Sequence, residues 1–152
     1  MNAKIRFGID FFYIMAGMEY AQDPKVNKSK VIVPVLLVLE WGFSTQEQNE
    51  TTNLFWKMKK DGRLDDYEDV LARLLSHVKD YPDQKARLLS HLMLMANVDG
   101  KVTEEEIEFT KGLANVLDVD KVEFGELANR ADDIFNILFW YAENHHFMTQ
   151  SK

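Results

Sequence analysis

Acidic residues beside turns are the groups of this chain with the clearest potential for chemistry. Glu104, Glu105 and Glu106 closely follow Asp99, and carboxylates are the ligands that Ca²⁺ and Mg²⁺ prefer. The turn at Asp99 is one of three similar turns whose aspartates follow one another at intervals of 38 residues: Asp23-Pro24-Lys25-Val26, Asp61-Gly62-Arg63-Leu64 and Asp99-Gly100-Lys101-Val102. The third turn is therefore a candidate divalent-cation site, with further oxygen ligands offered by the second at Asp61, Asp65 and Glu68.

The residues at these turns do not favour an ordinary EF-hand. With Gly100 aligned to the turn glycine, the first ligand position falls on Met95, which has no oxygen donor. The second copy places Lys57 and Lys59 at its first two ligand positions. A structural interpretation stays open beside the metal one: glycine adopts the positive φ that ends a helix, the aspartate accepts turn N–H groups, and Asp65 or Thr103 caps the next helix.

Composition limits the classes of partner. The chain has 152 residues, no cysteine and a net charge of −7. Residues 1–60 carry 8 basic and 6 acidic side chains (+2), and residues 61–152 carry 10 and 19 (−9). Nucleic-acid binding needs basic side chains that neutralise phosphates, so no nucleic-acid partner is expected, and cations or basic protein surfaces are favoured. The lack of cysteine fits a cytoplasmic protein, and no apolar stretch reaches the roughly 18 residues of a membrane span.

The repeated turns require helices to position them. A period of this length predicts a helix–turn–helix unit used repeatedly, and apolar residues recur at helical spacing over most of the chain. We therefore predict an all-α fold in a single domain over residues 1–152. In the first helix one stripe predicts one buried face: Phe7, Phe11, Ile14, Met15 and Met18. Later helices are expected at about 28–41, 45–59, 64–79 and 81–97, then from 103, from 120 and over 131–147.

Cap and breaker residues mark several of these boundaries. Pro34 lies inside the second predicted helix, where its missing N–H predicts a kink or a division near Val33. Gly42 is expected to end that helix, and Pro82 to begin the fifth. Three pairs have the spacing of a capping box: Ser44 with Glu47, Thr103 with Glu106, and Asp120 with Glu123. The apolar positions of the sixth helix are Ile107, Phe109, Leu113, Val116 and Leu117.

Groups for acid–base catalysis at neutral pH are scarce. The four histidines stand at positions 77, 91, 145 and 146, and neither His77 nor His91 has a histidine four residues on. Both lie inside predicted amphipathic helices, and we interpret each as a boundary residue between the buried and the exposed face. No phosphate loop, nucleophile elbow or His-Glu-x-x-His pattern occurs, so the chain is predicted not to be an enzyme.

Aromatic residues beside basic ones offer two interpretations. Lys57, Lys59 and Lys60 follow Phe55 and Trp56, and this cluster is either a contact for an anionic surface or a solvated helix end whose aromatic rings turn inward. Trp41 also has two interpretations. We favour a core residue at the end of a helix over a residue that closes a partner-binding groove.

The string from Leu92 to Glu106, Leu-Met-Leu-Met-Ala-Asn-Val-Asp-Gly-Lys-Val-Thr-Glu-Glu-Glu, resembles the recurring turn of TerB-like, tellurite-resistance-associated helical domains. In that family an apolar helix ends in a small residue and Asp-Gly, followed by an aliphatic residue, a Ser or Thr cap and acids. The resemblance covers about 30 residues, to Asp118, and the turns at Asp61 and Asp23 are weaker echoes. It implies a compact bundle of about seven helices with internally related halves.

The resemblance also implies a bacterial, intracellular protein that is associated with stress response and binds metal through acidic residues. Matching the motif positions assigns a candidate Ca²⁺ or Mg²⁺ site to Asp61, Asp65, Asp99 and Glu106. The predicted function is a non-enzymatic interaction or sensing module with a protein partner. Two alternatives stay open: a metal-assisted enzyme that uses the same carboxylates, and a structural bundle without an ion.

Overall fold

Most of the chain that the structure describes is helical. The computed structural model describes residues 1–20, 29–96, 104–120, 122–127 and 129–131. Its helices are α1 (Ala3–Tyr20), α2 (Ser29–Leu39), α3 (Thr45–Lys60), α4 (Tyr67–Val78), α5 (Pro82–Ala96) and α6 (Glu104–Val116). A short helical segment over 122–127 follows, and these ranges contain no strand. The predicted all-α class is confirmed, whereas a single domain over residues 1–152 stays a prediction.

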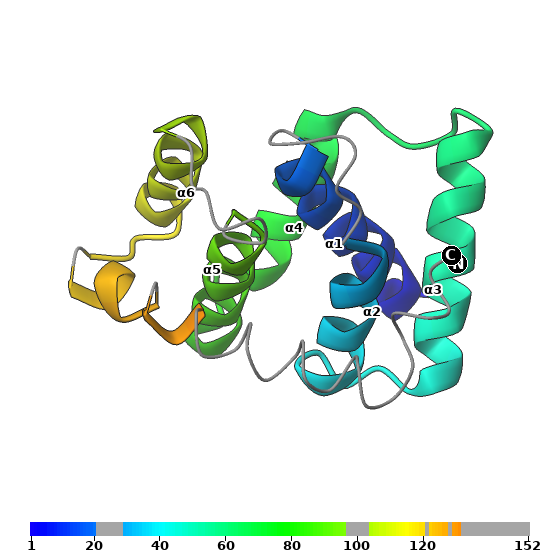
Figure 1. The fold of residues 1–152 in the computed structure, drawn as a ribbon, viewed down its shortest axis with the longest axis horizontal. Coiled ribbons are helices and arrows are strands. Elements are labelled where there is room, and N and C mark those ends of the chain that lie inside the picture. Colours follow the sequence, from blue (N-terminus) through cyan, green and yellow to red (C-terminus); the bar gives the residue numbers. More distant parts are fainter. Residues whose placement is uncertain (21–28, 97–103, 121, 128, 132–152) are drawn as a thin grey trace.

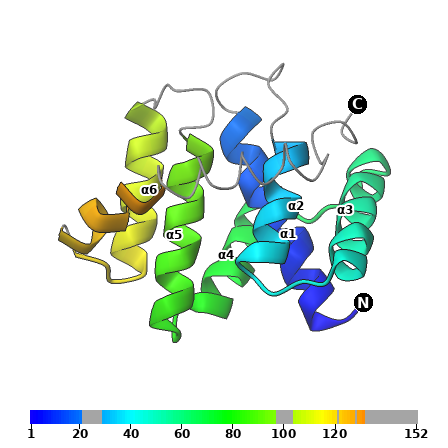
Figure 2. The same cartoon turned by 60° about the horizontal axis from the view of Figure 1, so that its bottom comes forward.

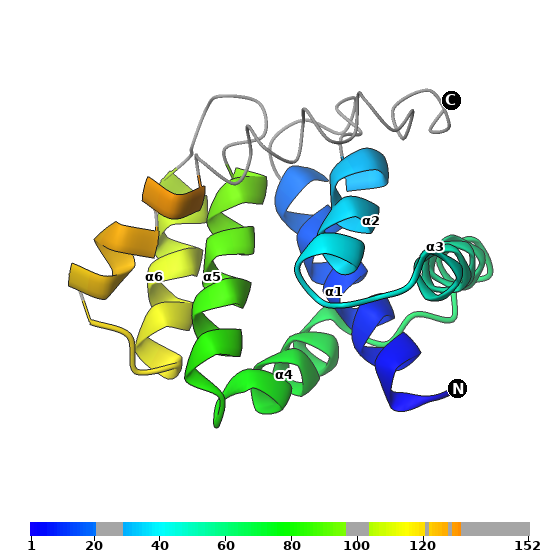
Figure 3. The same ribbon diagram turned by 90° about the horizontal axis from the view of Figure 1, so that it is seen from below.

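The first helix, α1, lies at the centre of the arrangement. It contacts α2, α3, α4 and α5, and α6 packs on the far side of α5 (Figure 1). Figure 3 shows α5 and α6 side by side at one end and α3 at the other, with α1, α2 and α4 between them. The prediction that α1 buries a single face was wrong. Because neighbours lie around it, burial extends beyond that stripe, and between residues 5 and 17 only Arg6, Tyr13 and Gly17 are partly exposed. The buried apolar residues of α1 are Ile5, Phe7, Ile9, Phe11, Phe12, Ile14, Met15 and Ala16.

Close packing of α1 against α3 explains one of its glycines. A Cβ atom on Gly8 would lie 2.7 Å from Cγ2 of Thr51 and 2.9 Å from the Phe43 ring. These separations are shorter than non-bonded carbon atoms tolerate, so the two helices can approach this closely only where α1 has no side chain. Nearby, the Phe12 and Phe55 rings stack with their centroids 4.5 Å apart.

The helix α2 is continuous through its proline. Pro34 lies inside Ser29–Leu39 and is buried with Val33 and Val35, so the predicted division near Val33 does not occur. Packing of this apolar helix on α1 and α3 holds it in place despite the missing N–H. Gly42 follows with a φ of 71°, as expected for the residue that reverses the chain after a helix.

Most predicted boundaries agree with the structure to within three residues. Pro82 is the first residue of α5, and Figure 2 shows α4 leading into it. The N–H of Glu123 donates to the Asp120 carboxylate at 2.9 Å, so the cap predicted before the short seventh helix is confirmed. In α6 two of the five predicted apolar positions, Ile107 and Val116, are exposed, because its buried side instead includes Thr110 and other residues. That side is formed by Thr110, Leu113, Ala114 and Leu117.

Several predicted features lie outside the described residues. They are the first acidic turn at Asp23, the Asp99 turn with its Thr103 cap, and the last predicted helix beyond residue 131.

Candidate functional site

The second acidic turn is the end of α3. Asp61 is its C-cap, and Gly62 follows with a φ of 68°. The Gly62 N–H donates to the Lys59 carbonyl at 3.2 Å and the Arg63 N–H to the Met58 carbonyl at 2.9 Å, which is the paired pattern of a Schellman motif. The predicted role of glycine in ending the helix is confirmed at Gly62. The Asp61 carboxylate is exposed and lies 3.9 Å from the Arg63 guanidinium.

Asp65 does not cap α4, contrary to the structural interpretation of the sequence. The N-cap is Asp66, which makes no side-chain cap hydrogen bond. Asp65 Oδ2 instead accepts hydrogen bonds from Arg6 of α1 at 2.9 Å and from Arg73 of α4 at 2.8 Å. The two arginines, one of them 59 residues away in α1 and beyond any local spacing rule, therefore determine what this carboxylate does.

Arg73 also holds the buried carboxylate of α1. Its Nε and Nη2 donate to Asp10 Oδ2 at 2.9 Å and Oδ1 at 2.8 Å, a bidentate pair. Asp10 is 4% exposed, so its charge requires this partner. The hydrogen bonds to Asp10 raise the pKa of Arg73, and those to Asp65 add to the effect. One guanidinium thus links α1, α4 and the connection between α3 and α4.

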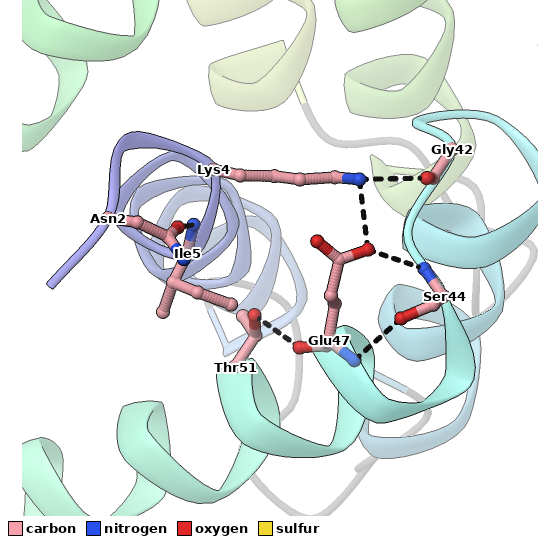
Figure 4. A network of polar contacts seen from close by, with 7 residues as sticks. All are labelled: Asn2, Lys4, Ile5, Gly42, Ser44, Glu47 and Thr51. Carbon is pink, nitrogen blue, oxygen red and sulfur yellow. Dashed lines mark hydrogen bonds and ion pairs between the residues drawn. The ribbon is translucent and has the colours of Figure 1, made fainter.

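The other end of α3 has a different arrangement, shown in Figure 4. Ser44 and Glu47 form the predicted capping box: the Glu47 N–H donates to Ser44 Oγ at 3.0 Å, and the Ser44 N–H donates to Glu47 Oε1 at 2.9 Å. Lys4 of α1 reaches the same place, where its Nζ lies 2.9 Å from Glu47 Oε1 and 3.0 Å from the Gly42 carbonyl. The Ser44 N–H lowers the pKa of Glu47 most, and Lys4 lowers it further.

The structure tests the candidate metal ligands only in part. Asp61 and Asp65 are described, whereas Asp99 and the side chain of Glu106 are not. Within the described ranges, no three residues among His, Cys, Asp and Glu come together in a group that could hold a metal ion. A cation at Asp65 would compete with two guanidinium groups, so Asp61 fits a cation better. The four-ligand set stays a prediction.

His91 is the functional group that the sequence interpretation misplaced. Its predicted boundary position was wrong, because its exposed fraction is 0%. The Trp41 indole N–H donates to His91 Nδ1 at 3.1 Å, and Glu40 Oε1 lies 3.5 Å from Nε2. Burial lowers the pKa of His91 more than the contact with Glu40 raises it. The run from Leu88 to Met95, in which Ser90 and His91 are flanked on both sides by apolar residues, was the available sequence signal for its burial.

The structure also gives the positions of His77 and of the aromatic residues that the sequence singled out. His77 is exposed, and its ring centroid lies 4.7 Å from that of Phe7. Trp41 is partly buried against the core, so its interpretation as a core residue is confirmed. Phe55 is buried and Trp56 packs beside it, with Lys59 Nζ 5.1 Å from the Trp56 ring centroid. The aromatic rings of the basic cluster therefore turn inward.

Comparison with known proteins gives one match. A family model described as tellurite resistance protein TerB matches residues 33–129, which is more than half of the chain and begins inside α2. No curated protein and no solved structure matches. Among the described helices, none is both long and apolar enough to cross a membrane.

Proposed function

The chain belongs to the TerB family, and we propose that it is a non-enzymatic helical module for interaction or sensing in a bacterial stress response. One observation carries the non-enzymatic part. Among the residues that the structure describes, two buried groups suit acid–base chemistry, Asp10 and His91, and both are held by side chains from other parts of the fold. Arg73 neutralises the first, and the Trp41 N–H occupies the acceptor nitrogen of the second. Both groups act in joining helices.

The exposed acids supply the interaction surface in this proposal. Asp61, Asp66, Glu68 and Asp69 are exposed around the α3–α4 connection and the first turn of α4. With a net charge of −7 on the chain, they favour a divalent cation or the basic surface of a protein partner. The cation site would use Asp61, Asp99 and Glu106, with Asp65 contributing only if it leaves its arginines. The cytoplasm is the proposed location.

Isothermal titration calorimetry with Ca²⁺ and with Mg²⁺ tests the cation site. Wild-type protein should release or absorb heat, and its thermal unfolding temperature should rise with metal concentration. The gain is about 2.7 kcal/mol when the free ion exceeds its dissociation constant a hundredfold. Asp99→Asn and Asp61→Asn should weaken binding, whereas Asp83→Asn, at an exposed acid in the first turn of α5, should not.

Two outcomes count against the proposal, and they are separable. Absence of heat and of a thermal shift at millimolar metal removes the cation but leaves the interaction module. Asp65→Asn is a control for effects that do not involve metal, because it should lower stability in the absence of metal by disturbing Arg6 and Arg73.

The protein partner is tested by affinity capture with wild type and with Asp61→Asn. Equal recovery of a partner by both proteins would exclude the acidic turn as the contact.

A further inference from the structure

A partly buried hydrogen bond between α5 and the segment that directly follows α2 depends on the protonation state of His91. Trp41 and His91 are 50 residues apart, and the indole Nε1 lies 3.1 Å from the imidazole Nδ1. An indole N–H can only donate, so Nδ1 must offer its lone pair. The imidazole proton is therefore on Nε2. A cation cannot bind at Nε2 in this tautomer, because that nitrogen has no lone pair to give.

The groups around the ring determine how it responds to acid. The Nε2 atom faces Glu40 Oε1 at 3.5 Å, a separation beyond the usual range of a hydrogen bond. Glu40 favours the imidazolium, and Arg87 and Arg130 oppose it. From α1 the ring meets the uncharged ring of Phe11 edge-on, with centroids 5.8 Å apart. The carboxylate beside it in sequence, Asp10, is neutralised by Arg73 and does not act as a counterion.

Protonation is incompatible with the Trp41 contact. An imidazolium carries N–H groups on both nitrogens, so Nδ1–H would face the indole N–H at a distance that suits a donor and an acceptor. Other atoms along the same face of α5 are already unsatisfied. Among the described residues, three buried side-chain atoms lack a hydrogen-bond partner: Gln84 Oε1, Arg87 Nε and His91 Nε2. Their spacing of three and four residues puts them on one stripe, which faces the end of α2 at His91.

We propose that His91 and Trp41 form a pH-operated latch, in which protonation of His91 breaks the indole–imidazole hydrogen bond and releases the end of α2 from α5. The imidazolium then turns toward Glu40. Trp41 is one wall of a cavity of about 290 Å³ that is also lined by Phe7, Phe43 and His77. Release of the Trp41 side chain widens this cavity. It also loosens the connection between α2 and α3, where the Lys4 ammonium donates to the Gly42 carbonyl.

The direction of the pH effect follows from burial. Burial lowers the pKa of His91 below its ordinary value of 6.5, so the folded protein binds fewer protons than the unfolded chain just below that pH. The stability contributed by the latch is complete above pH 6.5. It is lost as the pH falls from there toward the pKa of the folded state.

Two-dimensional ¹H–¹⁵N NMR of the indole N–H groups tests the latch. The Trp41 resonance is identified by its absence in Trp41→Phe, and wild type is titrated from pH 7.5 to pH 4.5. The resonance should shift in a single step below pH 6.5, before global unfolding measured by circular dichroism. The carbon resonances of His91 should report protonation with the same midpoint, which makes the test independent of any variant that fails to fold.

Three variants give the test its controls. His91→Gln keeps an oxygen that can accept the indole N–H but does not titrate, so the step should vanish. Glu40→Gln removes the carboxylate that favours the imidazolium, so the midpoint should move to lower pH. His77→Gln removes the exposed histidine that lines the same cavity and should leave the step unchanged. A Trp41 step that persists in His91→Gln, or that coincides with global unfolding, overturns the proposal.

Discussion

At the start of α3, Ser44 and Glu47 form a hydrogen-bonded cap from residues only three positions apart. After the end of α3, Gly62 reverses the chain, and Asp65 binds two arginines instead of capping α4. Both connections contain a glycine with positive φ and a carboxylate near a helix start. Only the first uses its carboxylate locally. The second uses Asp65 to join α1 and α4.

The same helix supplies cations to both connections. Lys4 reaches the first and Arg6 the second, although they are two residues apart in α1. Lys4 adds to a cap that Ser44 and Glu47 already complete by themselves. Arg6 instead shares Asp65 with Arg73, which is also the partner of the buried Asp10. The comparison indicates that the second connection depends on tertiary contacts and the first mainly on local ones.

The largest effect is expected at Arg73. Arg73→Met leaves the buried Asp10 carboxylate without its partner. Fully buried pairs lose about 3–5 kcal/mol in this way, and partial exposure of Arg73 reduces the expected loss to about 2–3 kcal/mol. Urea unfolding measures the difference. Arg63→Met, at an exposed arginine 3.9 Å from Asp61, is the matched control and should change little. Equal losses in the two variants would contradict the tertiary role of Arg73.

The two turn glycines come next. Gly42→Ala and Gly62→Ala each place a Cβ atom in the left-handed region, at φ values of 71° and 68°, and should each cost about 1–2 kcal/mol. Gly112→Ala is the control, because it lies in the interior of α6 and its added Cβ meets nothing within 4 Å. It should stabilise by about 0.5–1 kcal/mol. Thermal unfolding temperatures that fell for all three would show that backbone conformation is not the cause.

The two helix starts provide a matched pair of caps. Ser44→Ala removes the side-chain acceptor of the Glu47 N–H and should cost about 1 kcal/mol. Asp66→Ala removes an N-cap side chain that makes no cap hydrogen bond, so its effect should be clearly smaller. Denaturant midpoints measure both. A loss at Asp66 as large as that at Ser44 would mean that the two caps are equivalent, contrary to the comparison.

Lys4→Met should have the smallest effect of the series. The Lys4 and Glu47 side chains are both partly exposed, and Glu47 keeps its hydrogen bond from the Ser44 N–H when the lysine is gone. The difference between wild type and variant should shrink further in 1 M salt, where the Debye length is about 3 Å. Thermal unfolding at low and high salt measures it. A loss that approached that of Arg73→Met would reverse the proposed order of the two connections.

Local sequence patterns predicted the helices well. The Ser44–Glu47 box, the Gly62 helix end, the Pro82 helix start and the Asp120 cap were all recognised from residues within a few positions of one another. Each depends on backbone geometry or on a hydrogen bond that a short segment makes with itself. The continuity of α2 through Pro34 was not predicted, because it depends on packing against α1 and α3.

Side-chain roles were predicted less well than helices. Asp65 was expected to cap α4 and His91 to lie at the edge of a buried helix face, and both expectations were wrong. The partner of Asp65 in α1 is 59 residues away, and the partner of His91 is 50 residues away. No spacing rule connects residues so far apart. The four candidate ligands Asp61, Asp65, Asp99 and Glu106 remain a prediction as a set, because Asp99 and the side chain of Glu106 lie outside the described residues.

The sequence by itself determined the all-α class, most helix boundaries and membership of the TerB family, because helical periodicity, caps and family motifs are written in neighbouring residues. Only the tertiary structure decided which helix lies at the centre of the fold. The central helix of the fold, α1, precedes the span that matches the family, and it packs against α2, α3, α4 and α5. Tertiary packing likewise decided the roles of Asp10, Asp65 and His91. A buried or paired polar group needs a partner, and for each of these three residues a partner comes from a distant segment of the chain.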